Sequence, residues 1–483
     1  MKRATEMLAV CVFCSALAAC GGERSPMNPV PTITAIAPDN AAPDGPGFTL
    51  TVNGSNFVKA SIIEWNRNAR PTQFISSSTL TADIPSDDIV ASGNSSITVT
   101  NPGGTSNSMS FVVPCVLAEP EPASNQTRVR LGAYYFDGWS TLASDHFMGM
   151  LNGPYRDREP LSGWVDSTPC SVEQQLAWAH RFGLSFFIFD TYYKPDVIIN
   201  YHENLDNALE IMHSLPDRHG MDFAIMDADP LIPLSEWSAA VDSWVAYFSD
   251  PGYMRINGKP VFFVLSFGMM EGQFGGSAAV ADALNTLRTS AATHGFPGVY
   301  IVAGLTLPGS ISGQDSQYPD LNYVQGEGYD ALSVYNYPYI VPPVDGMLPF
   351  SVLADTGTWI ARQTVLHSAL PYIPTAMSGW DPRPWDERDG ITGDLLWFSR
   401  SPEDVAKLVD DLISWAESDP SGRPEPAPAP PIVLIEAWNE MGEGSHFVPT
   451  IGEGTSYGDA IAEKLLAPIG SATPATLSRG ARH

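Results

Sequence analysis

Two glutamates near the end of the chain are of a residue type that can cleave a glycosidic bond, and their spacing allows both to face one cleft. Glu440 and Glu443 lie three residues apart in Trp438-Asn-Glu-Met-Gly-Glu-Gly444, directly after the apolar run Pro431–Ala437. The reaction needs one group to protonate the leaving oxygen and another to deliver a nucleophile or stabilise the oxocarbenium ion. Gly442 and Gly444 permit a tight backbone path between the two glutamates. The alternative is a helix start, in which one glutamate caps backbone amides and the other is solvated.

Aromatic, acidic and amide side chains also follow five other apolar runs of the chain. Aromatic rings stack on the C–H faces of sugars, and carboxylates and amides bind sugar hydroxyls, so together these run ends indicate a carbohydrate cleft. A single aromatic residue at such a position is more often a packing residue. The predicted sugar contacts are Tyr134, Tyr135, Asp190, Tyr192, Asp227, Tyr335, Trp380, Asp381, Trp438 and Asn439.

The elements that must position these side chains are apolar strands alternating with amphipathic helices over residues 130–470. Ser171 with Gln174 predicts one helix start through a capping box, and Ser401 before a proline predicts another. Eight predicted strands with helices between them favour a (β/α)₈ barrel, whose functional groups lie where strands end. An open doubly wound sheet is the alternative, but no glycine-rich phosphate fingerprint follows the first strand. The predicted strands are Arg130–Tyr135, Leu184–Phe189, Asp222–Met226, Pro260–Leu265, Gly298–Ala303, Ala331–Val334, Tyr372–Ala376 and Pro431–Ala437.

Residues 31–113 have a different sequence pattern, in which short runs of alternating apolar and polar residues are separated by Gly, Pro and Asn. This pattern predicts an immunoglobulin-like β-sandwich. The predicted strands are Ile33–Ala37, Phe48–Val52, Ser61–Trp65, Thr79–Asp83, Ser96–Thr100 and Met109–Val113. The segment resembles an IPT/TIG domain, and the matching marks are Ile36-Ala-Pro38, Val52-Asn-Gly-Ser-Asn-Phe57, Ala82-Asp-Ile-Pro85 and Val99-Thr-Asn-Pro-Gly-Gly104. Residues 114–129, rich in proline and glutamate, are predicted to be a linker to the barrel.

The first 19 residues have a basic start and a short apolar stretch that ends in Leu17-Ala-Ala-Cys20. They resemble a bacterial lipoprotein signal, which implies cleavage before Cys20 and lipidation of its thiol. Residues 20–30 are then a tether, and the expected location is the outer membrane, on its periplasmic or its surface face. An ordinary secretory signal, with Cys20 incidental, is the alternative. Residues 471–483 are predicted to be a C-terminal tail.

Composition and cysteine content limit the partners of this chain. The 483 residues carry 25 Lys and Arg against 54 Asp and Glu, a net charge of −29, which argues against nucleic-acid binding. The chain has no apolar run of about 18 residues, the length of a membrane-spanning helix. After removal of the signal and lipidation of Cys20, Cys115 and Cys170 remain, either as one disulfide or as two buried thiols. No metal-ligand or nucleotide motif is present, so no metal and no cofactor is expected.

Over residues 130–465 the chain resembles the barrels related to glycoside hydrolase family 99, in particular those of the WbsX type. The marks are Gly132-Ala-Tyr-Tyr-Phe136, Asp190-Thr-Tyr-Tyr193, Leu205-Asp-Asn-Ala208, Asn257-Gly-Lys-Pro260, Ser378-Gly-Trp-Asp381 and Ala437-Trp-Asn-Glu-Met-Gly-Glu-Gly444. Two positions depart from the family pattern, since Met441 stands where a Trp is usual and Glu436 where an Asn is usual.

The resemblance implies an endo-acting α-mannosidase type of chemistry, with retention and without a metal, on a polysaccharide or oligosaccharide. It implies that Glu440 is the base that deprotonates the sugar 2-hydroxyl, giving a 1,2-anhydro intermediate. Glu443 is then the acid for the leaving group and afterwards the base that activates water. Two other functions stay open: a non-catalytic cell-surface glycan-binding protein, and a glycosyltransferase-like protein of surface polysaccharide synthesis. Export argues against the transferase, because nucleotide sugars stay in the cytoplasm.

Overall fold

The computed structural model describes residues 29–41, 45–89, 93–113, 128–139, 149–164, 168–193, 205, 207–229, 232–305, 318–338, 346–388, 390, 396–426 and 429–466. These residues form two compact units, one within residues 29–113 and the other within residues 128–466. The predicted signal, Cys20, Cys115 and the C-terminal tail lie outside the described residues. Among the helices described, none has the length and apolar character needed to cross a membrane.

The N-terminal unit is the predicted β-sandwich. One sheet has the order β1 (Thr32–Ala37), β2 (Phe48–Ser55), β6 (Thr79–Ile84), β5 (Thr72–Ser76). The other has the order β4 (Asn68–Ala69), β3 (Ile62–Trp65), β7 (Gly93–Asn101), β8 (Gly104–Thr105), with β9 (Met109–Val113) also paired to β7. Alternate side chains of both sheets, among them Val52, Ile63 and Phe111, are buried in one shared core. All six predicted strands are present, and β4, β5 and β8 are short additions that the pattern did not predict.

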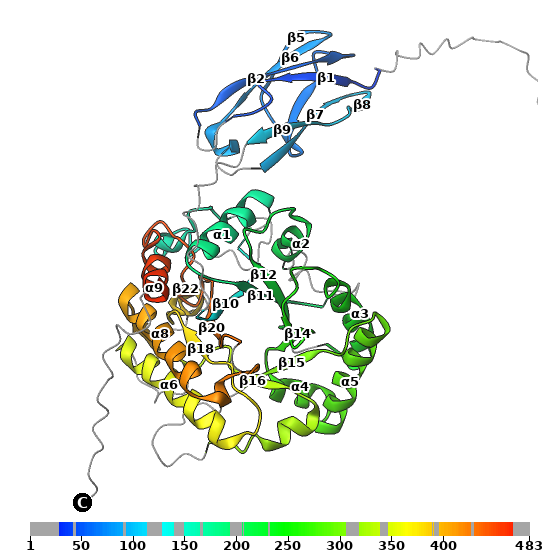
Figure 1. Ribbon diagram of the computed structural model, residues 1–483. Coiled ribbons are helices and arrows are strands. Elements are labelled where there is room, and N and C mark those ends of the chain that lie inside the picture. The colour runs from blue at the N-terminus through cyan, green and yellow to red at the C-terminus, as the bar shows by residue number, and fades with distance from the viewer. Residues whose placement is uncertain are drawn as a thin grey trace, which may run out of the picture. The chain divides into compact units, whose positions relative to one another are not determined.

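The C-terminal unit is a ring of eight parallel strands surrounded by helices (Figure 1). In chain order the strands are β10 (Arg130–Tyr135), β11 (Phe186–Thr191), β12 (Asp222–Asp227), β14 (Lys259–Val264), β15 (Tyr300–Gly304), β16 (Ala331–Ser333), β18 (Thr375–Met377) and β20 (Ile432–Glu436). Strand β20 pairs with both β10 and β18. The ring closes between β16 and the segment before β18, where Leu332 N donates to Pro371 O at 2.9 Å and Ile373 N donates to Leu332 O at 2.8 Å. The predicted (β/α)₈ barrel is therefore confirmed.

The helices of this unit follow the strands along the chain, as the alternating pattern predicted. They are α1 (Pro169–Arg181), α2 (Asn207–Ser214), α3 (Trp237–Tyr247), α4 (Phe267–Phe274), α5 (Ser277–Thr293), α6 (Phe350–His367), α7 (Arg383–Arg388), α8 (Pro402–Ser418) and α9 (Ser456–Leu466). Short strands β13 (Arg255–Ile256), β17 (Gly346–Pro349) and β19 (Leu396–Ser399) and the 3₁₀ turns lie between them.

The two predicted helix starts have different outcomes. Helix α8 begins as predicted, because Ser401 Oγ accepts from Asp404 N at 3.2 Å. Helix α1 begins two residues before the predicted capping box. Its N-cap is Thr168, whose Oγ1 accepts from Ser171 N at 3.3 Å, and the proline at its first position has the backbone angle that a helix start requires.

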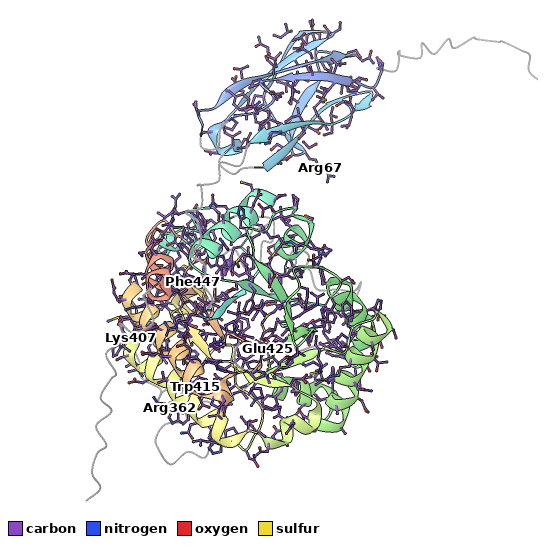
Figure 2. The ribbon with its side chains drawn as sticks, viewed as in Figure 1. Arg67, Arg362, Lys407, Trp415, Glu425 and Phe447 are labelled. Atoms are coloured by element: carbon purple, nitrogen blue, oxygen red, sulfur yellow. The ribbon has the colours of Figure 1, made fainter. Side chains whose placement is uncertain are left out.

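Strand alternation divides the apolar side chains of the barrel into two layers. Tyr134, Ile188 and Met226 point into the ring of strands, whereas Tyr135 and Phe187 point outward and pack beneath the helices. Figure 2 shows that side chains fill both the inside of the ring and the layer outside it. The barrel interior is therefore a packed core, and the chemistry is restricted to the strand ends.

The close approach of β14 and β15 gives a test of this packing. A Cβ atom on Gly304 would lie 2.0 Å from Leu265 O and 2.5 Å from Val264 O. Relief of this clash would require two paired strands of the close-packed barrel to move apart, which costs free energy. We expect Gly304→Ala to lower the free energy of unfolding by about 2 kcal/mol. The measurement is urea unfolding followed by Trp fluorescence, which reports mainly on the barrel because eleven of the twelve Trp follow residue 138.

The matched control is Gly272→Ala in α4, where a Cβ meets nothing within 4 Å. That change is expected to leave the free energy of unfolding unchanged or raise it by up to about 1 kcal/mol, because alanine favours the helix. Equal stability of Gly304→Ala and the parent protein would contradict the packing described for β14 and β15.

Candidate active site

The two glutamates lie on a small hairpin that follows β20 at the C-terminal end of the barrel. Strand β21 (Asn439–Glu440) pairs antiparallel with β22 (Ser445–His446), and Glu440 lies opposite Ser445. The amide of Asn439 fixes the hairpin to the end of β10: its Oδ1 accepts from Phe136 N at 2.9 Å and its Nδ2 donates to Phe136 O at 2.6 Å. Glu440 is therefore carried by an element with little freedom to move.

The glycines of this hairpin are required by close neighbours. A Cβ on Gly442 would lie 2.1 Å from Nε1 of Trp385, and Gly444 has a φ of +67° with Asp381 directly against it. Residues 441–444 therefore form a tight turn, and it places the Glu443 carboxyl group close enough to Glu440 and Asp190 for their charges to act on it.

A tyrosine and an aspartate from other strands meet Glu440. The hydroxyl of Tyr335, just after β16, lies 3.0 Å from Glu440 Oε1 and 3.1 Å from Asp190 Oδ2 at the end of β11. A phenol has one proton, so it satisfies one carboxylate fully and offers the other only a lone pair unless that group is itself protonated. The ring of Tyr335 packs on Tyr134 of β10 at a centroid distance of 4.8 Å. Four different segments thus converge on one point.

The carboxyl groups at this point hold their protons unequally. Burial raises the pKa of Glu440 to about 7, and the Tyr335 hydroxyl partly offsets the rise by favouring the carboxylate. Burial, followed by the charges of Glu440 and Asp190, raises the pKa of Glu443 well above its usual range. Burial and the charge of Glu440 do the same to the pKa of Asp190. Glu440 therefore ionises first, and its charge keeps Glu443 protonated, which provides one base and one acid side by side.

Glu443 has an oxygen that no described side chain satisfies. The residue is partly exposed, yet its Oε2 is buried and has no hydrogen-bond partner among the described residues. Its backbone oxygen accepts from Asp381 N at 2.5 Å, which fixes the turn from behind. The carboxyl group itself is left available to a ligand in the site.

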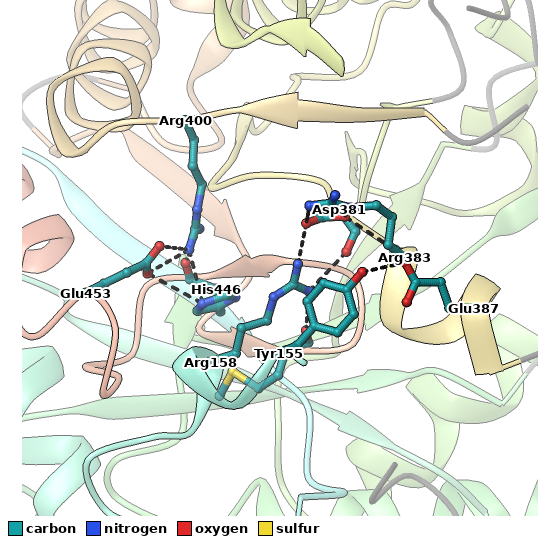
Figure 3. Close-up of polar contacts among 9 residues, drawn as sticks. Tyr155, Arg158, Asp381, Arg383, Glu387, Arg400, His446 and Glu453 are labelled. Carbon is teal, nitrogen blue, oxygen red and sulfur yellow. Dashed lines mark hydrogen bonds and ion pairs between the residues drawn. The ribbon is translucent and has the colours of Figure 1, made fainter. Parts of the chain in front are cut away.

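Asp381, predicted as a sugar contact, is occupied by two arginines in this structure (Figure 3). Arg158 donates to one carboxylate oxygen, and Arg383 Nε and Nη2 donate to both oxygens at 2.7 and 2.8 Å. Although burial alone would raise it, the hydrogen bonds of Arg383 and the charge of Arg158 bring the pKa of Asp381 below its usual range. Arg158 also donates to Met441 O at 2.8 Å, so this ion pair supports the turn that carries Glu443.

A second arginine cluster supports the other side of the hairpin (Figure 3). Arg400 donates to both oxygens of Glu453 at 2.7 Å, to His446 Nε2 at 3.1 Å and to Ser378 O at 3.0 Å. Burial and the charge of Arg400 lower the pKa of His446 to about 4, so the imidazole is neutral near pH 7. The cluster fixes β22 to the segment after β18.

Several predicted sugar contacts do not face the carboxyl groups. Tyr135 and Trp438 lie in the outer apolar layer, where strand alternation puts them, and Trp438 is fully buried with its indole N–H donating to Gln175 Oε1 at 2.8 Å. Trp380 is 3% exposed in the same layer. These three positions are corrected to packing residues, and Asn439 to a residue that anchors the hairpin.

The remaining two predicted contacts lie elsewhere at the strand ends. Asp227, at the end of β12, lines a separate small cavity together with Trp237, Met270 and Gln273. Tyr192 is half-buried beside Phe136 and stays a predicted contact. Of the predicted set, the structure brings together Tyr134, Asp190, Tyr335, Glu440 and Glu443. Among the described residues, no group of three His, Cys, Asp or Glu is placed to hold a metal ion.

Sequence reasoning gave no site role to three residues that the structure places beside the glutamates. Glu436 is the last residue of an apolar strand, so the sequence pattern did indicate an acid in a buried position. Trp385, packed on Gly442, and Arg158, bound to Met441 O, come from segments without strand or motif signals. Their positions depend on tertiary packing.

Cys170, at the start of α1, is in a disulfide. The other four cysteines of the chain lie outside the described residues, so the pairing of Cys170 with Cys115 stays a prediction.

Two family models match separate regions of the chain. The model described as glycosyltransferase WbsX matches residues 232–461, and the IPT/TIG domain model matches residues 31–113. No curated protein matches the chain.

The chain is also similar to several solved structures. A family 99 endo-α-mannosidase from Bacteroides thetaiotaomicron is 12% identical, with 70% of this chain and 95% of that chain covered and a TM-score of 0.47. A family 39 glycoside hydrolase from Bacteroides cellulosilyticus is 9% identical, with 90% and 82% covered and a TM-score of 0.37. The TIG domain of human nuclear factor of activated T-cells, cytoplasmic 4, is 20% identical, with 19% and 93% covered and a TM-score of 0.15. The chain therefore combines an IPT/TIG domain with a barrel domain that the WbsX family model matches.

Proposed function

We propose that this chain is a glycoside hydrolase that cleaves within a polysaccharide, on α-mannoside-type linkages and with retention. The observation that carries the proposal is the pair Glu440 and Glu443, held on one hairpin, with the pKa of Glu443 raised further than that of Glu440. Their position at the C-terminal end of a parallel barrel is where such enzymes place catalytic groups. The order and spacing of the motifs that resemble family 99 support the same reaction.

In the proposed reaction each glutamate handles one proton. The Glu440 carboxylate accepts the proton of the sugar 2-hydroxyl while that oxygen forms a bond to the anomeric carbon. The bond to the leaving oxygen breaks at the same time, and Glu443 gives that oxygen its proton. In the second half, Glu443 accepts a proton from water as the water oxygen opens the 1,2-anhydro ring, and Glu440 returns its proton to the sugar. Two displacements at the anomeric carbon give net retention.

The Tyr335 hydroxyl has a defined part in this proposal. It donates to Glu440 and so favours the carboxylate that must act as the base. Asp190, on the other side of the same hydroxyl, holds its own proton because burial, followed by the charge of Glu440, raises its pKa well above the usual range. In this arrangement the three side chains carry one negative charge, and it stays on Glu440, the proposed base.

The description of the matching family model favours glycosyl transfer as a second candidate. A nucleotide-sugar donor brings a diphosphate, which proteins bind with basic groups, metal ions or backbone amides. The charged groups that act on Tyr335 are the carboxyl groups of Asp190, Glu440, Glu436 and Glu443, and an ionised carboxylate among them repels a diphosphate. A glycan-binding protein without activity would not need two neighbouring carboxyl groups of unequal pKa. These two considerations favour the hydrolase.

Replacement of either glutamate tests the proposed roles. We expect Glu440→Gln and Glu443→Gln each to lower hydrolysis of an α-mannan by about a thousandfold, because general acid–base catalysis contributes on the order of 10²–10⁴. The measurement is product masses after digestion of a panel of mannans and bacterial polysaccharides, with UDP- and GDP-sugars added in parallel reactions. Incorporation of sugar only with a nucleotide donor would identify a transferase instead.

The control for these variants is Glu463→Gln, an exposed glutamate on α9, which should leave hydrolysis unchanged. Full activity of Glu443→Gln would exclude the acid role assigned here.

The pH dependence tests the contact of Tyr335 with Glu440. The rate should rise with pH as Glu440 ionises, near pH 7, and fall at higher pH as Glu443 loses its proton. Tyr335→Phe removes a donor that favours the Glu440 carboxylate, so it raises the pKa of Glu440 and should move the rising limb to higher pH by about one unit. The measurement is kcat/KM from pH 5 to pH 10.

Tyr337→Phe is the matched control, because the Tyr337 hydroxyl donates to Thr375 O at 3.2 Å and takes no part at Glu440. The rising limb should stay in place in that variant. A limb that moves to lower pH in Tyr335→Phe would contradict the assignment of Glu440 as the base.

We also propose that the chain is exported and anchored through Cys20, on the evidence of its first 20 residues alone. Expression in a bacterium fed labelled palmitate should give a labelled, membrane-bound protein, and Cys20→Ala should abolish both the label and the membrane association. The control is Cys170→Ala, which should keep the label. Membrane association of an unlabelled Cys20→Ala protein would favour a different anchor.

A further inference from the structure

A third glutamate of the site has no part in the proposed reaction. Glu436, the last residue of β20, is 0% exposed and lies beneath the hairpin that carries the other two. Its Oε1 has no hydrogen-bond partner among the described residues, and its Oε2 lies 2.5 Å from Ser445 Oγ. A buried acid normally has a charged partner or carries a proton.

The hydrogen bonds around Ser445 favour a proton on Glu436. Besides Glu436 Oε2, Ser445 Oγ has Gly379 O at 2.9 Å and Glu436 O at 3.1 Å. All three neighbours are acceptors when Glu436 is ionised, yet a serine hydroxyl has a single proton to donate. If Glu436 carries a proton, it donates to Ser445 Oγ, and Ser445 then donates to Gly379 O. Only in that arrangement does a proton lie in both the contact between Glu436 Oε2 and Ser445 Oγ and the contact between Ser445 Oγ and Gly379 O.

The groups that face Glu436 provide no positive charge. They are Tyr134 from β10, Asp190 from β11, Tyr335 and Tyr337 after β16, and Glu440 and Glu443 on the hairpin. Burial first, and the charge of Glu443 next, raise the pKa of Glu436 well above its usual range. On the β18 side, Arg400 reaches Ser378 O, but its charge is met by Glu453. A carboxylate at Glu436 would therefore be an uncompensated buried charge.

Ser445 connects Glu436 to both catalytic glutamates. It pairs with Glu440 across the hairpin, and the turn between them contains Glu443. Its hydroxyl also spans from the end of β20 to Gly379, just after β18. A fixed Ser445 side chain thus fixes the register of the hairpin against two strands of the barrel.

We infer that Glu436 is a positioning residue, which as a neutral carboxylic acid donates to Ser445 and through it holds the hairpin that orients Glu440 and Glu443. The consequence for catalysis rests on the proposed function, whereas the neutral state and the contact with Ser445 do not. Gln at this position keeps a donor and stays neutral, whereas Leu has a similar size and no donor.

The first test is independent of any substrate. Difference infrared spectroscopy should show the carbonyl stretch of a protonated carboxylic acid that persists at pH 8 and is lost in Glu436→Gln. Urea unfolding of Glu436→Leu, Ser445→Ala and the double variant should show that the second change adds little to the first, because both remove one contact. Absence of the infrared band at pH 8, or fully additive losses of stability, would overturn the inference.

The second test uses hydrolysis. Glu436→Leu and Ser445→Ala should each lower kcat about tenfold to a hundredfold with little change in KM, since misplaced catalytic groups slow the chemical step. Glu436→Gln should restore most of the kcat that Leu loses and should keep the pH limbs of the parent. A falling limb that moves by a unit or more in Glu436→Gln would show that Glu436 ionises during the reaction and would overturn the inference. If the parent protein hydrolyses no glycan, the proposed function fails, and the infrared and unfolding results still decide the state of Glu436.

Discussion

The burial of four carboxyl groups beside one another is the constraint on which this site depends. Asp190, Glu436, Glu440 and Glu443 come together at one end of the barrel, and burial first, with the charge of Glu440 in addition, raises the pKa of the other three. In such a cluster the first group to ionise determines the state of the rest. That group is Glu440, the carboxyl group whose pKa is raised only to about 7 and whose raised pKa has burial alone as its cause. Acid and base roles are thereby assigned by position, without any difference in residue type.

The barrel meets this constraint with supports placed outside the cluster. Asn439 anchors the hairpin to β10, the Asp381 ion pairs hold the turn, and Arg400 fixes β22. The arginines lie behind the hairpin, where they satisfy backbone oxygens and acids other than the four of the site. Had any of these three guanidinium groups faced the cluster, it would have lowered the pKa of a nearby carboxyl group and removed the acid.

The fold was largely predictable from the sequence, because its signals are local. Alternation of apolar strands with helices predicted all eight barrel strands, and Ser401-Pro402 predicted the start of α8. The hairpin glutamates and Tyr335 were also found, since they follow apolar runs. Which way a residue at a strand end points was harder to foresee: Tyr134 faces the site, whereas Tyr135 and Trp438 face the helices. A shift of one residue along a strand moves a side chain from one face of the sheet to the other, and the sequence pattern alone does not determine that register.

The central claim is that Glu440 and Glu443 act in turn on one anomeric carbon. Real-time proton NMR of an α-mannan digestion observes the anomeric configuration of the first product before it mutarotates. The proposed two-step reaction predicts that α product appears first and that the β form accumulates later. β product at the earliest time, or no release of reducing ends at all, would contradict it.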